Sequence, residues 1–385
     1  MDDRDGNKIT QKAHQVLEQH YRRQAAAEAI YHANRLDWQR GVVEWVEVFR
    51  EALKLSCYEQ CRELLEIRPD LLIQDDFQLG RISQCEGNHF AQLARYAEAQ
   101  QEYREAIEAY NQTLSRDPDY IKAHNNMGVA LKSLADSQAN LSLHNEAQQN
   151  YRLAIESYNQ ALLRAPDYTD AHNNKGIALR KLADLQTNPS QCNEAQQNYQ
   201  QAIESFNQAT ALSPDDIAAH NNKGNALQSL AILQANLSQY NEAKQSYQQA
   251  IESCNQALSR APDYINAHNS KGIALRGLAD LQANLSQHDE AQQHYQQAIE
   301  AYNQALSCAP DYIYALNNEG VALKNLGNLQ VALGQQQAAR NNWQLALGLF
   351  ARVLQLAPND AIAQRQKDQV QALLDGLDDE GESVS

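Results

Sequence analysis

The chain has 385 residues, 21% of them charged, and a formal net charge of −16. A surface this acidic repels phosphate backbones, so nucleic acid is not an expected partner. No segment approaches the roughly 18 apolar residues that a membrane span needs, and the polar first residues do not match a signal peptide. The six cysteines are scattered and show no paired spacing, which favours free thiols in a reducing, cytoplasmic compartment.

Residues 8–71 are expected to form a helical N-terminal cap, after a disordered polar segment at 1–7. Within the cap, apolar residues at helical spacing predict three helices, at 8–35, 38–55 and 57–67. The last two are expected to form a degenerate repeat that covers the first apolar face of the array behind it.

From residue 72 onward the sequence has a period of 48 residues. Six prolines mark this period: Pro118, Pro166, Pro214, Pro262, Pro310 and Pro358. A fixed period of this length is typical of a solenoid, in which each unit buries its apolar face against its neighbours. The predicted units are 72–119, 120–167, 168–215, 216–263, 264–311 and 312–359.

Each unit is predicted to be a helical hairpin. In residues 168–215, apolar residues lie at helical spacing in both halves, and the segment 187–191 interrupts them. One glycine recurs in the first half of every unit: Gly80, Gly128, Gly176, Gly224, Gly272 and Gly320. Glycine inside a helix costs about 1 kcal/mol relative to alanine, so its recurrence predicts a close approach of backbones that leaves no room for a side chain.

The small and aromatic residues of the unit resemble the tetratricopeptide repeat. In 168–215 the matching residues are Gly176, Ala178, Ala202, Phe206, Ala209 and Pro214. The resemblance recurs six times and covers about three quarters of the chain, although the family's unit has about 34 residues and this one has 48. It implies an all-α fold, a right-handed α-solenoid superhelix of helical hairpins, which holds partners on a concave wall of first helices. A capping helix at 360–375 and an acidic disordered tail at 376–385 are expected to follow.

The face of each first helix opposite its apolar stripe is the candidate binding surface. Asparagines recur there: Asn125, Asn126, Asn173, Asn174, Asn221, Asn222, Asn269, Asn317 and Asn318. A side-chain amide both donates and accepts, so it can pair with the backbone of an extended peptide of any sequence. The ladder of Asn126, Asn174, Asn222 and Asn318 is similar to that in the repeat groove of the O-linked N-acetylglucosamine transferases, whose catalytic region has no counterpart here. Alternatively, these asparagines cap local backbone or tie neighbouring helices together.

A basic row accompanies the asparagines on the same face: Lys132, Arg180, Arg276 and Lys324. In an acidic chain, this row favours an acidic peptide or a C-terminal carboxylate as ligand. The alternative is a solvated face whose charges have no ligand.

Two further columns of polar residues are expected to be structural. Lysines at 175, 223 and 271 fall within the apolar stripe and are predicted to pair with glutamates 204, 252 and 300 of the same units. Histidines at 124, 172, 220 and 268 recur at a spacing of about 9–10 Å between units, which is too far apart to share one metal ion. Neither a metal nor a cofactor is expected.

The sequence shows no catalytic triad order, phosphate-binding loop, metalloprotease motif or paired-carboxylate site. The predicted function is therefore non-enzymatic: a monomeric scaffold or adaptor that binds an extended or acidic protein segment in the concave groove. One alternative is a self-associating or spacer scaffold that uses its convex or tip surfaces. Another is a regulatory input module for a separate effector enzyme.

Overall fold

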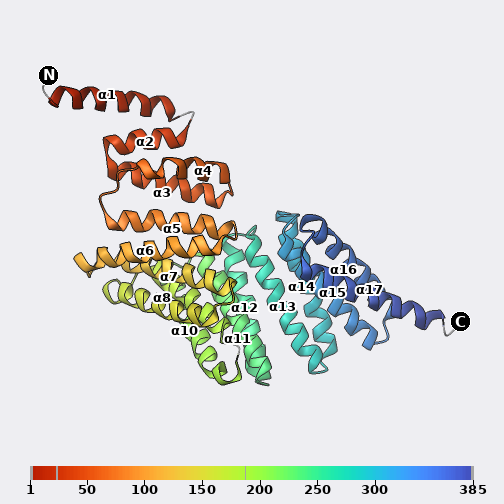
Figure 1. The fold of residues 1–385 in the computed structure, drawn as a ribbon. Helices are drawn as coiled ribbons and strands as arrows, with labels where there is room; N and C mark the ends of the chain where they lie inside the picture. The colour runs from red at the N-terminus through yellow and green to blue at the C-terminus, as the bar shows by residue number, and fades with distance from the viewer. Residues whose placement is uncertain (1–2, 23–24, 187, 383–385) are drawn as a thin grey trace. The chain divides into compact units, whose positions relative to one another are not determined.

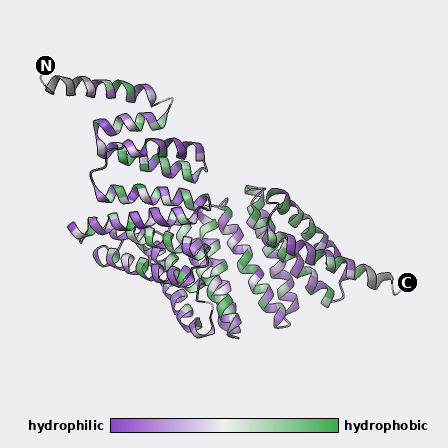
Figure 2. Cartoon of the chain, viewed as in Figure 1, coloured by the Kyte–Doolittle hydropathy of each residue, from purple (hydrophilic) through white to green (hydrophobic). Residues whose placement is uncertain are grey.

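The computed structural model describes residues 3–22, 25–186 and 188–382, and within them it contains α-helices and short 3-10 turns but no strand (Figure 1). The chain divides into two compact units, Met1–Leu185 and Gln186–Ser385. In both, consecutive long helices pack against one another as hairpins. Hydrophilic and hydrophobic residues alternate along each helix (Figure 2), as expected for helices that bury one face.

The first unit holds the N-terminal cap and the first hairpins. Its elements are α1 (Asp3–Tyr21), α2 (Ala26–Leu36), α3 (Trp38–Lys54), α4 (Tyr58–Ile67), η1 (Arg68–Asp70), α5 (Asp76–Gln92), α6 (Tyr96–Arg116), α7 (Ile121–Asn140), α8 (His144–Arg164) and α9 (Thr169–Asp184). The helices predicted at 38–55 and 57–67 are present as α3 and α4. Helices α5 and α7 are the first helices of their hairpins, and α6 and α8 are the second.

The second unit continues the same alternation. Its elements are η2 (Pro189–Gln191), α10 (Cys192–Leu212), α11 (Ile217–Asn236), α12 (Tyr240–Arg260), α13 (Ile265–Asn284), α14 (His288–Cys308), α15 (Ile313–Ala332), α16 (Gln336–Leu356) and α17 (Ala361–Glu382). The break predicted at 187–191 coincides with η2, although residue 187 itself lies outside the described residues. Helices α11, α13 and α15 are first helices, and each packs against the second helix that follows it.

The recurring glycine makes room for an aromatic ring rather than for a backbone. A Cβ atom added to Gly128 would lie 2.6 Å from the ring of Tyr158, and one added to Gly272 would lie 2.5 Å from the ring of Tyr302. Both rings come from the second helix of the same hairpin and are fully buried. The expectation of backbone contact was therefore wrong at these positions, because the large side chain at the centre of the second helix fills the space.

The predicted helix over 8–35 is instead two helices, α1 and α2, which fold back on each other with Nδ1 of His14 2.8 Å from Nδ1 of His32. The sequence near 22–25 holds neither glycine nor proline, so no local signal marked the break. Its cause is tertiary, because the separate α2 buries Ile30 in the same core as Trp45 of α3.

Helix also extends into both ends that were expected to be disordered. Helix α1 begins at Asp3, within 1–7, and α17 continues to Glu382, within 376–385. Neither segment contains proline, and Leu377 packs against a core that includes Phe350 and Val370. The capping helix is therefore longer than the predicted 360–375. Residues 1–2 and 383–385 lie outside the described residues.

Candidate functional site

The asparagines predicted to line a binding surface lie on the first helices, where some link consecutive hairpins. Asn174 donates its side-chain N–H to Oδ1 of Asn125 at 3.3 Å, and Asn318 donates to Oδ1 of Asn269 at 3.1 Å. In these two places the amides tie neighbouring helices together, which is one of the roles that the pattern allowed. Asn125, Asn221 and Asn269 are buried, and the remaining predicted asparagines are half-buried: Asn126, Asn173, Asn174, Asn222, Asn317 and Asn318.

Members of the predicted basic row are half-buried and have partners within the chain. Lys132 donates to Oδ2 of Asp136 at 3.1 Å, and Arg180 makes the same contact with Asp184 at 2.8 Å. Lys324 instead donates to side-chain oxygens of Gln366 and Gln369 in α17. Arg276 is half-buried on α13. Acidic residues four positions further along the helix therefore offset much of the positive charge of the basic row. Their i, i+4 spacing is visible in the sequence, but it was not used to predict these contacts.

A three-residue link recurs between consecutive hairpins on this face. In the first unit, the Tyr151 hydroxyl donates to Asp136, and Nζ of Lys181 in α9 lies 3.2 Å from Oδ1 of the same carboxylate. In the second, Tyr295 donates to Asp280, as does the amide of Asn325 in α15, at 3.0 Å. We call this arrangement the tyrosine–acid–donor link.

The environment of Asp136 favours its charged form. Burial alone would raise the pKa of this carboxyl, but Lys132, Lys181 and the Tyr151 hydroxyl together hold the pKa below its usual value. At Asp136 the link is thus an ion pair between hairpins in which the acid has its hydrogen-bond partners.

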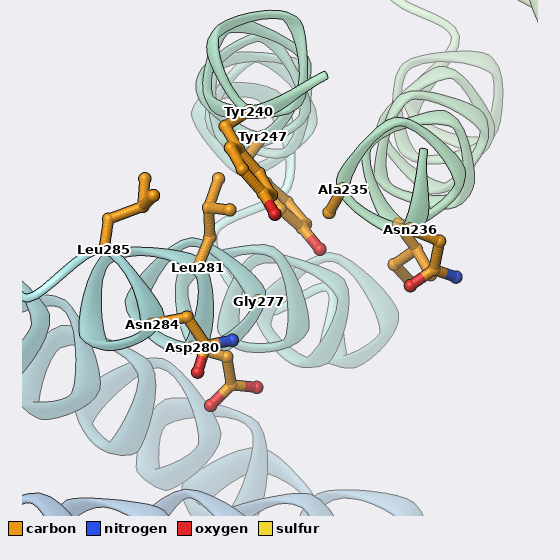
Figure 3. A pocket seen from close by; sticks show the side chains of 10 residues that line it. Ala235, Asn236, Tyr240, Tyr247, Gly277, Asp280, Leu281, Asn284 and Leu285 are labelled. Carbon is orange, nitrogen blue, oxygen red and sulfur yellow. The ribbon is translucent and has the colours of Figure 1, made fainter. Parts of the chain in front are cut away.

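Two cavities open on this face where the link is incomplete. The first, the Ser133 cavity, lies in the first unit and has a volume of about 560 Å³. The second, the Gly277 cavity, lies in the second unit and has a volume of about 480 Å³ (Figure 3). Their linings correspond residue by residue at a spacing of 144, or three repeats: Tyr96 with Tyr240, Tyr103 with Tyr247, Ser133 with Gly277, and Asp136 with Asp280.

Short side chains explain why both cavities open. Ser133 and Gly277 occupy the repeat position of the donors Lys181 and Asn325. Asn88 and Ile232 occupy the position of the acid, so no charged pair spans either gap. The sequence shows these substitutions, but only the structure shows that the donor of one hairpin meets the acid of the preceding one.

The Ser133 cavity is rich in basic groups. Its lining includes Arg50 and Lys54 of α3 and Lys132 of α7, against one acid, Asp136. The Tyr103 hydroxyl donates to Oδ1 of Asn88 at 2.8 Å, which closes one wall. This arrangement can attract and hydrogen-bond an anionic group.

The histidine column has a structural role in the described residues. Nε2 of His124 lies 2.8 Å from the carbonyl oxygen of Pro118, and His268 makes the equivalent contact with Pro262 at 2.7 Å. His172 and His220 repeat it with Pro166 and Pro214. Among the described residues, no group of three or more histidine, cysteine or acidic side chains is placed to hold a metal ion.

The lysines of the apolar stripe do not form the predicted pairs in the second unit. Within its described residues, Lys223 and Glu252 form no ion pair, and burial lowers the pKa of this lysine. Lys271 and Glu300 line a common cavity without an ion pair between them. In the first unit, burial lowers the pKa of Lys175, and the opposing influence is Glu156 of the preceding hairpin. The predicted pairs of Lys223 with Glu252 and of Lys271 with Glu300 are therefore wrong, and the acid that acts on Lys175 belongs to the preceding hairpin.

Family comparisons agree with the fold. The family described as "TPR repeat" matches residues 96–134 and 195–230, and two described as "Tetratricopeptide repeat" match 229–304 and 141–196. The chain belongs to the tetratricopeptide repeat family. Proteins of this family are in general non-enzymatic scaffolds that bind other proteins. No described helix has the length and apolar character needed to cross a membrane.

Several solved structures are similar to this chain. BtubC from P. vanneervenii is 16% identical over 66% of this chain and 89% of its own, with a TM-score of 0.46. YrrB, described as a TPR protein with an unusual peptide-binding site, is 14% identical over 68% and 99%, with a TM-score of 0.34. PilF of Pseudomonas aeruginosa is 16% identical over 76% and 99%, with a TM-score of 0.37. No curated protein matches the chain.

Proposed function

We propose that this chain is a non-enzymatic scaffold that binds an extended, acidic segment of a partner protein on the surface formed by its first helices. The observation that carries the proposal is the basic lining of the Ser133 cavity. In a chain of net charge −16, a local excess of positive charge beside a cavity favours an anionic ligand.

Basic side chains at this cavity are available to bind a ligand, because the acid beside them already has partners. The single acid, Asp136, is already engaged by Lys132 at 3.1 Å and Lys181 at 3.2 Å. Arg50 and Lys54 are exposed, and the only acid near Lys54 among its described ion pairs is the exposed Glu51, at 3.7 Å. An exposed pair of this kind contributes little, so the Lys54 side chain can turn toward a carboxylate.

The asparagine columns fit a segment in extended conformation. Consecutive first helices stack about 9–10 Å apart, and an extended peptide advances about 3.3 Å per residue. Within the first unit, one half-buried amide, such as that of Asn126 or Asn174, can therefore meet every third residue. Together with Lys132 and Arg180, these amides form the proposed binding surface.

Fluorescence anisotropy with two labelled dodecapeptides tests this proposal. Both have an alanine–glycine background; one carries four aspartates and a free C-terminal carboxylate, and the other carries four lysines and an amidated end. We expect only the acidic peptide to bind, more weakly as salt rises. The Arg50→Ala/Lys54→Ala variant should lose about tenfold in affinity.

The matched control is Arg62→Ala/Arg104→Ala, which removes the same charge from exposed positions outside the cavity. Its affinity should stay close to that of the wild type. Equal binding of both peptides, or equal losses in the two variants, would show that the basic cavity is not the binding site.

A second candidate, self-association through the hairpin tips, has one observation in its favour. In the second unit, three first helices are each followed by a leucine that is 37–39% exposed: Leu237, Leu285 and Leu333. A row of exposed leucines is able to bury itself against a second copy. Sedimentation velocity separates the two candidates, because peptide binding predicts a monomer at all concentrations and tip association predicts a larger species as concentration rises.

A further inference from the structure

A tyrosine hydroxyl with no hydrogen-bond partner among the described residues borders the Gly277 cavity. Tyr247 of α12 is 4% exposed, and among the described hydrogen bonds none involves its hydroxyl group. Its counterparts Tyr103, Tyr151 and Tyr295 donate to Asn88, Asp136 and Asp280 respectively. Burial, with Asp280 nearby, raises the pKa of Tyr247 to about 12, so it remains a neutral donor.

Two substitutions leave this donor without an acceptor. Ile232 stands where the other hairpins have an acid or an amide, and it offers no oxygen. Gly277 stands where Lys181 and Asn325 extend toward the preceding hairpin. A Cβ atom added to Gly277 would lie 2.6 Å from the Tyr247 ring, so the ring occupies the space in which a donor side chain would begin.

The walls of the cavity are mostly apolar. Ile232, Leu281 and Leu285 line it together with the rings of Tyr240 and Tyr247. Figure 3 shows the two leucines and the two rings. Its one charged lining residue, Asp280, already accepts hydrogen bonds from Tyr295 and Asn325. The cavity therefore offers no free charge of either sign, and its volume of about 480 Å³ lies within the range of about 300–1,000 Å³ that is typical of ligand sites.

The chain itself shows how an equivalent position is filled. Between α7 and α9 the side chain of Lys181 crosses to Asp136, and the charged pair closes the gap. At Ile232 and Gly277 the acid and the base are both absent, so an occupant must be uncharged. A backbone carbonyl of the occupant can accept a hydrogen bond from the Tyr247 hydroxyl, which opens into the cavity.

We propose that the Gly277 cavity is a specificity site for an aliphatic side chain of a bound peptide, whose adjacent backbone carbonyl accepts from the Tyr247 hydroxyl. This inference rests on the proposed function and adds a second residue preference to it. Within the second unit, the Gly277 cavity selects leucine, isoleucine, valine or methionine.

Selection from a phage-displayed library of random dodecapeptides tests the inference. The immobilised baits are the full wild-type chain, the variant Ile232→Asp/Gly277→Lys and the variant Arg50→Ala/Lys54→Ala. The first variant places the Asp136–Lys181 pair at positions 232 and 277, where the Tyr247 ring must shift to admit the lysine side chain. Sequencing of the selected peptides gives the enrichment of each residue type.

We expect the wild type to enrich both acidic and aliphatic residues. Ile232→Asp/Gly277→Lys should lose the aliphatic enrichment and keep the acidic one, and Arg50→Ala/Lys54→Ala should do the reverse. Aliphatic enrichment that survives in Ile232→Asp/Gly277→Lys overturns the inference and leaves the proposed function intact. If the wild type selects no peptide, both fail.

Tyr247→Phe provides a test that does not depend on the folding of the double variant. It removes only the unpartnered hydroxyl, so helical content by circular dichroism should be unchanged. Affinity for a wild-type-selected aliphatic peptide, measured by anisotropy, should fall by about three- to tenfold, while an acidic peptide without aliphatic residues should bind as before. Unchanged affinity for the aliphatic peptide overturns the role assigned to the hydroxyl.

Discussion

Nζ of Lys181 lies 3.2 Å from Oδ1 of Asp136, and so joins two consecutive hairpins through one ion pair. Asn325 makes the equivalent contact with Asp280 at 3.0 Å. At Ser133 and Gly277, which stand at the position of these donors, a cavity takes the donor's place. At these two junctions, the loss of a long donor side chain accompanies an open surface between neighbouring first helices.

Replacing Asp136 with asparagine should destabilise the first unit by about 1–3 kcal/mol at neutral pH. The reason is that Lys132 and Lys181 lose the carboxylate that holds them. Urea denaturation followed by circular dichroism measures the change, and Asp167→Asn, at an exposed position, is the control. If Asp136→Asn lowers the free energy of unfolding no more than Asp167→Asn does, the link does not contribute to stability.

The lowered pKa of Asp136 also predicts how the free energy of unfolding changes at acid pH. Because the pKa of Asp136 is lower in the folded chain than in the unfolded one, its contribution is present above the ordinary aspartate pKa of about 3.9 and is lost as pH falls below it. The difference in unfolding free energy between wild type and Asp136→Asn should therefore shrink from pH 6 toward about pH 3. A difference that stays constant over this range contradicts the assignment.

For Glu319, the predicted pH dependence of stability is opposite to that for Asp136. It is 7% exposed and stands at the position of Lys223 and Lys271 in earlier repeats, and burial raises its pKa to about 7. Because its pKa is higher in the folded chain, Glu319 favours folding only while it is protonated. This contribution to the free energy of unfolding is fully present below about pH 4.5 and is lost as the pH rises through about 7.

Glu319→Gln should therefore unfold at a higher temperature than the wild type at pH 8, with a gain of up to about 3 kcal/mol. The gain should vanish below about pH 4.5. Thermal unfolding at both pH values measures this, with the exposed Glu300→Gln as control. Equal stabilisation by Glu319→Gln at both pH values is the contrary result.

Two glycine substitutions should act in opposite directions. Gly128→Ala places a Cβ atom 2.6 Å from the buried Tyr158 ring, and overpacking of this kind should cost about 1–3 kcal/mol. Gly348→Ala meets no atom within 4 Å and should stabilise α16 by about 0.5–1 kcal/mol through helix propensity. Chemical denaturation of both variants measures the contrast, and destabilisation by Gly348→Ala would argue against this description of the helix.

The hairpins were predictable because their cause is local and repeated. Apolar spacing, the recurrent glycine and the prolines between units specify each helix pair in the sequence itself. The junction between α1 and α2 was not predictable, because its cause is the burial of Ile30 beside Trp45, and no glycine or proline marks it.

The candidate site was likewise predictable only in part. Helical geometry places Asn174 and Lys132 on the face opposite the apolar stripe, and the role of that face as a binding surface stays a prediction. The contacts between hairpins depend on which side chain of one repeat meets which of the next. Lys181 and Asp136 are 45 residues apart, and no periodicity within a helix links them. The cavities at Ser133 and Gly277 follow from that same contact and therefore needed the structure.

The most direct test of peptide binding at the Ser133 cavity is site-specific photo-crosslinking. A benzoylphenylalanine replaces Gln92, an exposed residue at the cavity, or Glu108, an exposed residue of the second helix α6. The acidic dodecapeptide is added and the products are mapped by mass spectrometry. The account predicts cross-links from position 92 that Arg50→Ala/Lys54→Ala abolishes, and none from position 108. Equal cross-linking from both positions, or none from position 92, would contradict it.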